Sequence, residues 1–318
     1  MASFGDTLRA ILRGEKSDAE ITTFLKTYND DDLTAEHVRI GVEVMRENMT
    51  PVDIDGAIDI VGTGGTGLHT LSISTASALV CAGAGARVAK HGNRAASSLT
   101  GTADTLSELG VNLAITPEKA AQCVDKAGVG FLFAPNHHPA MRFVGPARKA
   151  LGRRTIFNLL GPMSNPAGTD RMLVGVNNDK WRHLMANAFA NLGAKHIWVV
   201  HGVDGLDEIT TTSETFVSEV KDGKVTQFTL TPEAFGLKRV TIKALRGGHP
   251  ADNAKALRGL LNGKASAYRD IVLLNSGAAM MIAGKAKDIQ SGIALAAQSI
   301  DSGKAKAALA KLVEVSNG

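Results

Sequence analysis

The sequence is poor in the residues that mark several broad classes of protein. Aromatic residues account for only 4% of its 318 residues, and it has two cysteines, Cys81 and Cys123. Neither cysteine lies in a CxxC pair or in a Cys/His spacing that would hold a metal, which argues against a disulfide scaffold and a zinc site. We therefore expect both side chains to be buried free thiols, as in proteins of a reducing compartment.

Blocks of like charge are also lacking. The 35 Lys and Arg residues exceed the 31 Asp and Glu residues by four, and this excess is spread along the chain. Nucleic-acid-binding proteins usually have a basic stripe with interleaved aromatic residues, and none is visible here. We expect no nucleic-acid partner, and the mild positive charge is compatible with a small anionic substrate.

No apolar run is long enough to cross a bilayer. The most apolar segments, residues 76–86 and 271–283, are too short or too interrupted for that. Residues 1–14 carry three charged side chains and lack the apolar core of a signal peptide. We expect a cytoplasmic protein without a membrane partner.

The pattern of apolar residues predicts an α/β fold with a small helical domain. Residues 1 to about 50 have helical spacing, with a capping box at Ser17 and Glu20 and a further cap at Thr34. From Ala57 onward short strands alternate with helices, which is typical of a mostly parallel sheet covered by helices. We assign residues 1–55, joined by part of residues 150–190, to the helical domain and residues 56–318 to the α/β domain.

The individual elements follow from the same pattern. Strands are expected at residues 57–61, 86–89, 130–134 and 196–201, and helices at 74–84, 102–109, 117–126, 140–151 and from 252 onward. A hairpin is expected at residues 216–230, with its turn at Asp222-Gly223.

A glycine-rich segment, Gly62-Thr63-Gly64-Gly65-Thr66-Gly67, directly follows the first predicted strand. Glycines permit positive φ, and successive backbone N–H groups next to a helix N-terminus form an anion site. Its spacing is not that of a dinucleotide-binding loop, and no Gly-Lys-Ser/Thr ends it as in a Walker loop. An ordinary strand-to-helix turn is the alternative for this segment alone.

A cationic segment, Lys90-His91-Gly92-Asn93-Arg94, follows the predicted strand at residues 86–89. On a loop at the carboxyl end of a strand it would face the same crevice as the glycine-rich segment. A solvated basic turn is the simpler interpretation of this segment taken by itself.

An acidic segment, Asp204-Gly205-Leu206-Asp207-Glu208, follows the strand predicted at residues 196–201. Adjacent carboxylates suit a hard cation such as Mg²⁺, which is often shared with substrate phosphates. An acidic surface turn is the alternative.

These segments together resemble the anthranilate phosphoribosyltransferase family, in order and spacing over nearly the whole chain. The resemblance rests on Gly62-Thr63-Gly64-Gly65, Ser74-Thr75, Lys90-His91-Gly92-Asn93-Arg94, Asn136-His137-His138-Pro139, Phe157-Asn158-Leu159-Leu160-Gly161-Pro162, Asp204-Gly205-Leu206-Asp207-Glu208, Asn253-Ala254 and Leu274-Asn275.

The resemblance implies a nucleoside phosphorylase-like fold, a homodimer, and transfer of a phosphoribosyl group from phosphoribosyl pyrophosphate (PRPP) to the amine of anthranilate. PRPP would be bound by Gly62, Gly65, Thr66, Thr70, Ser72, Ile73, Ser74, Thr75, Lys90, His91, Gly92, Asn93, Arg94, Ala95, Ala96, Ser97, Ser98 and Thr102. Anthranilate would be bound by Gly62, Asn93, Pro135, His138 and Arg148. Two magnesium ions would be held by Ser74, Asp207 and Glu208.

The chain departs from the family pattern at three positions. Family members usually have Asp where this chain has Thr66, Asn where it has Ser72, and often an aromatic residue where it has Met141. Thr66 lacks a carboxylate beside the PRPP site, which puts the contacts to ribose and to metal-bound water in doubt. The acidic pair is intact, so the same reaction is expected.

Two other functions are compatible with the same fold. A pyrimidine nucleoside phosphorylase-like enzyme is disfavoured by Lys90-His91-Gly92-Asn93 and by the Asp207-Glu208 pair. A nucleic-acid-binding relative without enzyme activity would need an extended basic groove, which the sequence does not indicate.

Overall fold

The computed structural model describes residues 3–29, 31–95 and 98–318. The N-terminal part is helical, as predicted: α1 (Phe4–Leu12), α2 (Asp18–Thr27) and α3 (Ala35–Glu47). The capping box of α2 is confirmed, because the N–H of Ser17 donates to the Glu20 carboxylate at 2.9 Å and the N–H of Glu20 donates to the Ser17 hydroxyl at 3.4 Å. Thr34 caps α3 in the same way.

A sheet of seven strands forms the centre of the molecule, in the order β3-β2-β1-β4-β5-β6-β7. Its strands are β1 (Ile58–Gly62), β2 (Val88–Gly92), β3 (Val129–Phe133), β4 (Arg171–Gly175), β5 (His196–Gly202), β6 (Thr215–Lys221) and β7 (Lys224–Leu230). The five strands from β3 to β5 are parallel, and β6 and β7 are antiparallel additions. The predicted α/β class with a mostly parallel sheet is confirmed.

The two faces of the sheet belong to two different cores. Ile58, Ile60 and Leu173 pack into one core, whereas Val61 and Met172 pack into the other, because successive strand residues point to opposite faces. The first core contains α4 (Ile73–Gly83), α5 (Thr102–Glu108), α11 (Pro250–Leu261), α12 (Ala267–Ile282), α13 (Ile289–Asp301) and α14 (Lys304–Asn317). The second contains α1 to α3, α8 (Gly145–Leu151), α9 (Phe157–Met163) and α10 (Asp179–Asn191).

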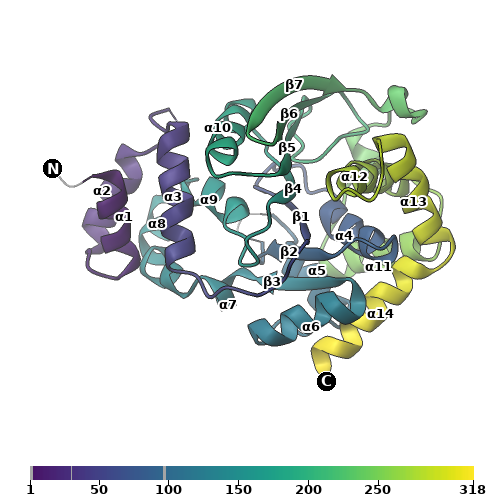
Figure 1. The fold of residues 1–318 in the computed structure, drawn as a ribbon, viewed down its shortest axis with the longest axis horizontal. Helices are drawn as coiled ribbons and strands as arrows, with labels where there is room; N and C mark the ends of the chain where they lie inside the picture. Colours follow the sequence, from purple (N-terminus) through teal and green to yellow (C-terminus); the bar gives the residue numbers. More distant parts are fainter. Residues whose placement is uncertain (1–2, 30, 96–97) are drawn as a thin grey trace.

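Figure 1 shows how these two groups of helices flank the sheet. The N-terminal helices lie at one end of the molecule, with α8 beside α2 and α9 beside α3, and the C-terminal helices lie at the other end with α4. The remaining elements are α6 (Pro117–Ala127), α7 (Ala134–His137), and the 3-10 helices η1 (Pro139–Phe143), η2 (Pro232–Phe235) and η3 (Ile242–Leu245).

Two predictions about elements need correction, and one strand was missed. Strand β2 begins later than predicted and continues to Gly92, since it pairs with β3 up to Gly92 and Phe133. Strand β4 was not predicted. The helix expected at residues 140–151 is two pieces, η1 and α8, because Gly145-Pro146 starts a new helix after Val144.

Two other predictions, the hairpin and the buried thiols, are confirmed. The hairpin turns at Asp222 and Gly223, which both have positive φ, of 48° and 77°, as a two-residue hairpin turn requires. Cys81 and Cys123 are buried free thiols. Over residues 3–29, 31–95 and 98–318, none of the helices combines the length and apolar character that crossing a membrane requires.

The sheet order reverses between β1 and β4. From β1 the chain proceeds outward through β2 to β3, and then returns to add β4 and β5 on the other side of β1. In α/β sheets a crevice forms outside the carboxyl ends of the strands at such a point, and ligands bind there. The end of β1 at Gly62 is therefore where the fold favours a binding site.

Candidate functional site

A cleft of about 700 Å³ opens at this point. Its lining comes from the ends of β1 and β2 with the loops that follow them, from Asp207 and Glu208, and from the segments around α7, α8 and α9. Every predicted site residue that the structure describes lines this cleft, including Pro135, Arg148 and Asp207. Ala96 and Ser97 lie outside the described residues. The cleft thus brings together segments that are far apart in the sequence, and the roles of the individual residues stay predictions.

One side of the cleft, which we call the glycine-loop wall, consists of residues 62–66, 72–75, Lys90, Asp207 and Glu208. Gly64, Gly65 and Gly67 have φ between 66° and 71°, a region that favours glycine. Gly62 has a different reason to be glycine, because a Cβ there would strike the carboxylate of Asp207. The end of β1 must therefore lack side chains for the acidic segment to approach it.

The two carboxylates accept hydrogen bonds from the glycine-rich segment and from the start of α4. The N–H of Gly64 donates to Oδ2 of Asp207 at 2.8 Å, and the N–H of Ser74 at the start of α4 donates to Oε1 of Glu208 at 3.2 Å. Burial raises the pKa of Glu208 to about 8, with a further contribution from the negative charge of Asp207, and burial also raises the pKa of Asp207. The positive charge of Lys90 therefore does not fully offset the cost of burying two neighbouring ionised carboxylates.

This donor set fits a magnesium ion. Among the described residues no three His, Cys, Asp or Glu side chains form a metal-binding group, so an all-protein cage is not built here. Asp207, Glu208 and the hydroxyl of Ser74 offer oxygen atoms only, and Mg²⁺ is usually held by one or two carboxylates together with substrate phosphates and water. The raised pKa values of Asp207 and Glu208 also fit a cation site, because a bound cation would favour the ionised carboxylates.

Lys90 lies inside strand β2 and not on a loop, which corrects the prediction for Lys90, His91 and Gly92. Its side chain is 2% exposed, and Nζ donates to the carbonyl oxygen of Ile60 and, at 3.2 Å, to the hydroxyl of Ser74. Burial lowers the pKa of Lys90, and the charges of Asp59, Glu208 and Asp207 oppose that shift. The extended pairing of β2 with β3 thus positions an ammonium group on which the charges of the acidic pair act.

The loop after β2 is held by Asp104, a residue that the sequence did not single out. One oxygen of its carboxylate accepts from Nη1 of Arg94 at 2.8 Å, and the other accepts from the N–H groups of Ala95 and Gly101 at 3.0 Å each. The side chain of Asn93 accepts from the N–H of Arg94 at 2.7 Å. The charge of Arg94 is therefore paired within the protein.

Ser72, one of the three departures from the family pattern, is fixed by neighbouring side chains. Its hydroxyl lies 2.8 Å from Oγ1 of Thr105, and its N–H donates to Oδ1 of Asn253 at 3.1 Å. Its carbonyl oxygen accepts from the hydroxyl of Tyr268 at 2.9 Å. The Ser72 hydroxyl already has a protein partner, although the residue lines the cleft.

A second group of lining residues, which we call the histidine wall, consists of Pro135, His138, Met141, Arg148, Phe157 and Asn158. The ring of His138 lies 5.1 Å from that of His91, measured between centroids. Burial lowers the pKa of His138 to about 4, and burial also places the pKa of His91 well below its usual value. Both imidazoles are therefore neutral at pH 7.

Arg148 supplies positive charge on this wall. Its guanidinium stands over the ring of Phe157, 5.7 Å from the centroid, and donates from Nη2 to Oδ1 of Asn158 at 3.4 Å. A guanidinium with one long hydrogen bond to protein retains donors for a carboxylate, which it can bind in a bidentate manner.

A second arginine, Arg154, was missed by the sequence analysis. It lines the cleft and donates to the carbonyl oxygens of Gly64 and Gly65 and to the side chain of Asn177. Its position close to the Phe157-Asn158 motif could have drawn attention to it. Nothing in the local sequence, however, indicates a hydrogen-bond partner ninety residues away in the chain.

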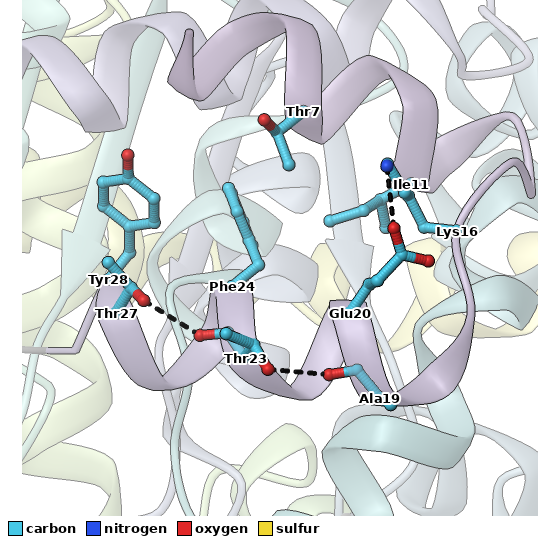
Figure 2. Close-up of a pocket in the computed structure, with 9 residues that line it drawn as sticks. All are labelled: Thr7, Ile11, Lys16, Ala19, Glu20, Thr23, Phe24, Thr27 and Tyr28. Atoms are coloured by element: carbon cyan, nitrogen blue, oxygen red, sulfur yellow. Dashed lines mark hydrogen bonds and ion pairs between the residues drawn. The ribbon is translucent and has the colours of Figure 1, made fainter. Parts of the chain in front are cut away.

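A smaller open groove of about 410 Å³ lies between α1 and α2. Figure 2 shows that Lys16, Thr23 and Thr27 each contact a residue four positions away in α2. Lys16 is 2.8 Å from Glu20, and the hydroxyls of Thr23 and Thr27 donate to carbonyl oxygens one turn earlier, at 2.9 and 3.0 Å. These features are those of an ordinary helix surface, and we assign the candidate site to the cleft.

Comparisons with known proteins point to one family. A family model described as "Glycosyl transferase family, a/b domain" matches residues 55–306. Anthranilate phosphoribosyltransferase of Mesorhizobium japonicum is 55% identical over 309 residues, which are 97% of this chain and 92% of that protein.

Solved structures agree. The anthranilate phosphoribosyltransferase of Thermus thermophilus superimposes with a TM-score of 0.93 and 42% identity, covering 99% of this chain and 95% of that one. The enzyme of Saccharomyces cerevisiae in complex with PRPP and Mg gives a TM-score of 0.90 and 27% identity, covering 99% and 92%. The yeast enzyme has also been solved in complex with 4-fluoroanthranilate.

Proposed function

This chain belongs to the anthranilate phosphoribosyltransferase family, and we propose that its cleft carries out the reaction of that family. The phosphoribosyl group of PRPP is transferred to the amine of anthranilate, giving N-(5-phosphoribosyl)anthranilate and pyrophosphate, a step of tryptophan biosynthesis. One observation carries the proposal: a single cleft is lined by the glycine loop, by Lys90 with two carboxylates, and by the segment that presents Arg148.

We assign PRPP and magnesium to the glycine-loop wall. Mg²⁺ would be held by Asp207, Glu208 and Ser74, whose oxygen atoms suit it, and two ions per site is our expectation from the family resemblance. When bound, the metal would neutralise charge on the pyrophosphate group. Lys90 supports the assignment, since its ammonium group is fixed beside Ser74.

We assign anthranilate to the histidine wall. Arg148 would bind its carboxylate, Asn93 and Gly62 would lie toward its amine, and Pro135 and His138 would border its entry path. A neutral His138 suits an aromatic ring, because it adds no charge that must be desolvated.

The reaction places two requirements on the side chains of the cleft. Departure of pyrophosphate develops positive charge at the anomeric carbon, as in glycoside cleavage, so the leaving group must be neutralised. The amine must also be held in line with the bond that breaks. Lys90 and the glycine loop serve the first need, and Arg148 with Asn93 serves the second. An aryl amine is neutral at pH 7 and attacks without a strong base.

The other expectations from the family resemblance are proposals of the same kind. We propose a cytoplasmic homodimer, to be tested by light scattering of the purified protein. We also propose that residues 1–55, joined by part of residues 150–190, form the helical domain and residues 56–318 the α/β domain. The core shared by α1 to α3 and α9 supports this division.

The decisive experiment follows the fluorescence of anthranilate in the presence of PRPP and Mg²⁺. We expect consumption of anthranilate that depends on all three components. No loss of fluorescence at micromolar enzyme would overturn the proposal. Release of base from thymidine with phosphate would favour the nucleoside phosphorylase alternative, and a salt-dependent gel shift would favour nucleic-acid binding.

A further inference from the structure

Two side chains, those of Arg154 and Asn177, hold carbonyl groups of the glycine loop. Nη2 of Arg154 donates to the carbonyl oxygens of Gly64, at 3.3 Å, and Gly65. Nδ2 of Asn177 donates to the same two oxygens, at 3.2 and 3.1 Å. Arg154 also donates from Nη1 to Oδ1 of Asn177, so the two side chains form one unit on two adjacent carbonyl groups.

Contacts with buried parts of the protein hold these two side chains in place. The guanidinium of Arg154 lies over the ring of Trp181, 5.3 Å from its centroid, and Trp181 is completely buried in α10. Asn177 lies between the end of β4 and the start of α10. The loop before α9 and the loop after β4 thus meet at the glycine loop, which cannot fix itself because Gly64 and Gly65 have no side chains and both have φ of 66°.

The same loop reaches the acidic pair. The carbonyl group of Gly64 is held by Arg154 and Asn177, and its N–H donates to Oδ2 of Asp207 at 2.8 Å. Positive charge from Arg154 also acts on Asp207. A change in the position of Gly64 would therefore disturb both the loop and a proposed metal ligand.

We propose that Arg154 and Asn177 are positioning residues that clamp the carbonyl groups of Gly64 and Gly65, so that the glycine loop and Asp207 are preorganised for PRPP with magnesium. This inference rests on the proposed function. Preorganisation matters here because a flexible glycine segment would otherwise lose conformational entropy when it binds an anion. The clamp acts on binding of PRPP and has no role in binding of anthranilate.

Two measurements on Arg154→Ala, Asn177→Ala and the control Arg153→Ala test the clamp. Arg153 is the exposed neighbour of Arg154, so its replacement removes the same charge from the same loop. In the ligand-free protein, amide hydrogen exchange of residues 63–67 should be faster in both clamp variants and unchanged in the control. Calorimetric titration with PRPP at fixed Mg²⁺, without anthranilate, should show affinity reduced roughly tenfold to a hundredfold in Arg154→Ala.

The pattern across variants decides between explanations. We expect Asn177→Ala to share the loss of PRPP affinity, the required Mg²⁺ concentration to rise in both variants, and the KM for anthranilate to stay unchanged. If only Arg154→Ala loses affinity and exchange is unaltered, Arg154 contacts PRPP directly and the clamp is wrong. Wild-type affinity in both variants would also overturn it. If Arg154→Ala does not fold, Asn177→Ala and Arg154→Lys, which keeps the charge but not the fork, provide the same comparison.

Failure of the proposed function would look different. In that case the wild-type protein itself would not bind PRPP, whereas hydrogen exchange would still report whether Arg154 and Asn177 hold the loop.

Discussion

The two walls of the cleft are built by different means. The glycine-loop wall stands on the ends of parallel strands, and its charged groups are fixed by short hydrogen bonds such as that from Gly64 to Asp207. The histidine wall stands on short helical segments, and its groups are fixed mainly by packing: His138 against His91, and Arg148 against Phe157. A parallel sheet positions backbone groups for an anion, whereas helices present larger side chains for a flat organic molecule.

The two walls also differ in the direction in which burial shifts the pKa of their side chains. On the glycine-loop wall, burial raises the pKa of Glu208, so ionised carboxylates are costly until a cation arrives. On the histidine wall, burial lowers the pKa of His138, so the imidazole stays neutral. The first wall is prepared for charge that the ligands bring, and the second for a ring with one carboxylate.

The largest effect is expected from removing the charges of the acidic pair. Asp207→Asn with Glu208→Gln keeps the shape but removes both carboxylates, so Mg²⁺ should bind far more weakly. Loss of one electrostatic stabiliser typically costs roughly 10²–10³ in rate, and loss of the metal at least that. Turnover measured against Mg²⁺ concentration should be nearly abolished, with partial recovery at high Mg²⁺.

The control is Glu214→Gln, which neutralises an exposed carboxylate immediately before β6. Circular dichroism should show both proteins folded. If the double variant kept the magnesium dependence of the wild type, the metal site would lie elsewhere and the assignment of the two walls would fail.

Replacement of Arg148 by Ala should affect only the histidine wall. Losing a charge-assisted partner of a carboxylate costs on the order of 2–5 kcal/mol in binding. The KM for anthranilate should rise accordingly, while PRPP affinity measured by calorimetry stays near that of the wild type. Lys149→Ala, an exposed neighbour on α8, is the matched control. Collapse of PRPP affinity with unchanged anthranilate kinetics would show that Arg148 belongs to the other wall.

The pH dependence of stability should have opposite signs on the two walls. His138 has a folded pKa of about 4 against an ordinary 6.5, so the unfolded state binds more protons between these values. Its contribution to the free energy of unfolding, about 3 kcal/mol at most, is present above pH 6.5 and is lost as pH falls toward 4. Glu208, with a folded pKa of about 8, behaves oppositely: the folded state binds more protons, and stability falls as pH rises from 4.5 to 8.

Denaturant unfolding without Mg²⁺ at a series of pH values separates the two contributions. His138→Gln should remove a rise of stability with pH between pH 4 and 6.5, and Glu208→Gln should remove a fall of stability with pH between pH 4.5 and 8. If both variants changed the slope of stability against pH in the same direction, the contrast between the walls would be contradicted.

Much of the sheet was predictable, because buried parallel strands are short apolar runs bounded by turns. The hairpin was predictable from Asp222-Gly223, whose positive φ values such a turn requires. Strand β4 was missed although it contains Met-Leu-Val, since a five-residue run after a long irregular segment has little periodicity. The extent of β2 was wrong because its pairing with β3 continues through Lys90 and His91, and the local composition there resembles a loop.

The site was predictable where its residues form local motifs, and not where they act through distant partners. The glycine, cationic and acidic segments are recognisable, and the structure places them around one cleft. Arg154, Asn177 and Asn253 reach the site across 90, 113 and 181 positions of the chain. Such contacts depend on the fold, so only the structure reveals them.

The smallest effect is expected at Thr66, where the glycine-loop wall departs from the family pattern. The Thr66 hydroxyl accepts from the N–H of Leu68 at 3.2 Å, and an Asp side chain can accept the same hydrogen bond in an equivalent turn. Gly65 and Gly67 on either side keep their positive φ, so Thr66→Asp should fold normally and use PRPP equally well or better. The KM for PRPP, measured at several Mg²⁺ concentrations, checks this, with Thr66→Asn as the control that has the shape of Asp without its charge. If Thr66→Asp lost most of its activity while Thr66→Asn did not, the added carboxylate would be harmful. The glycine-loop wall of this chain would then have adapted to a lower negative charge than its relatives carry, and the contacts to ribose would have to be assigned anew.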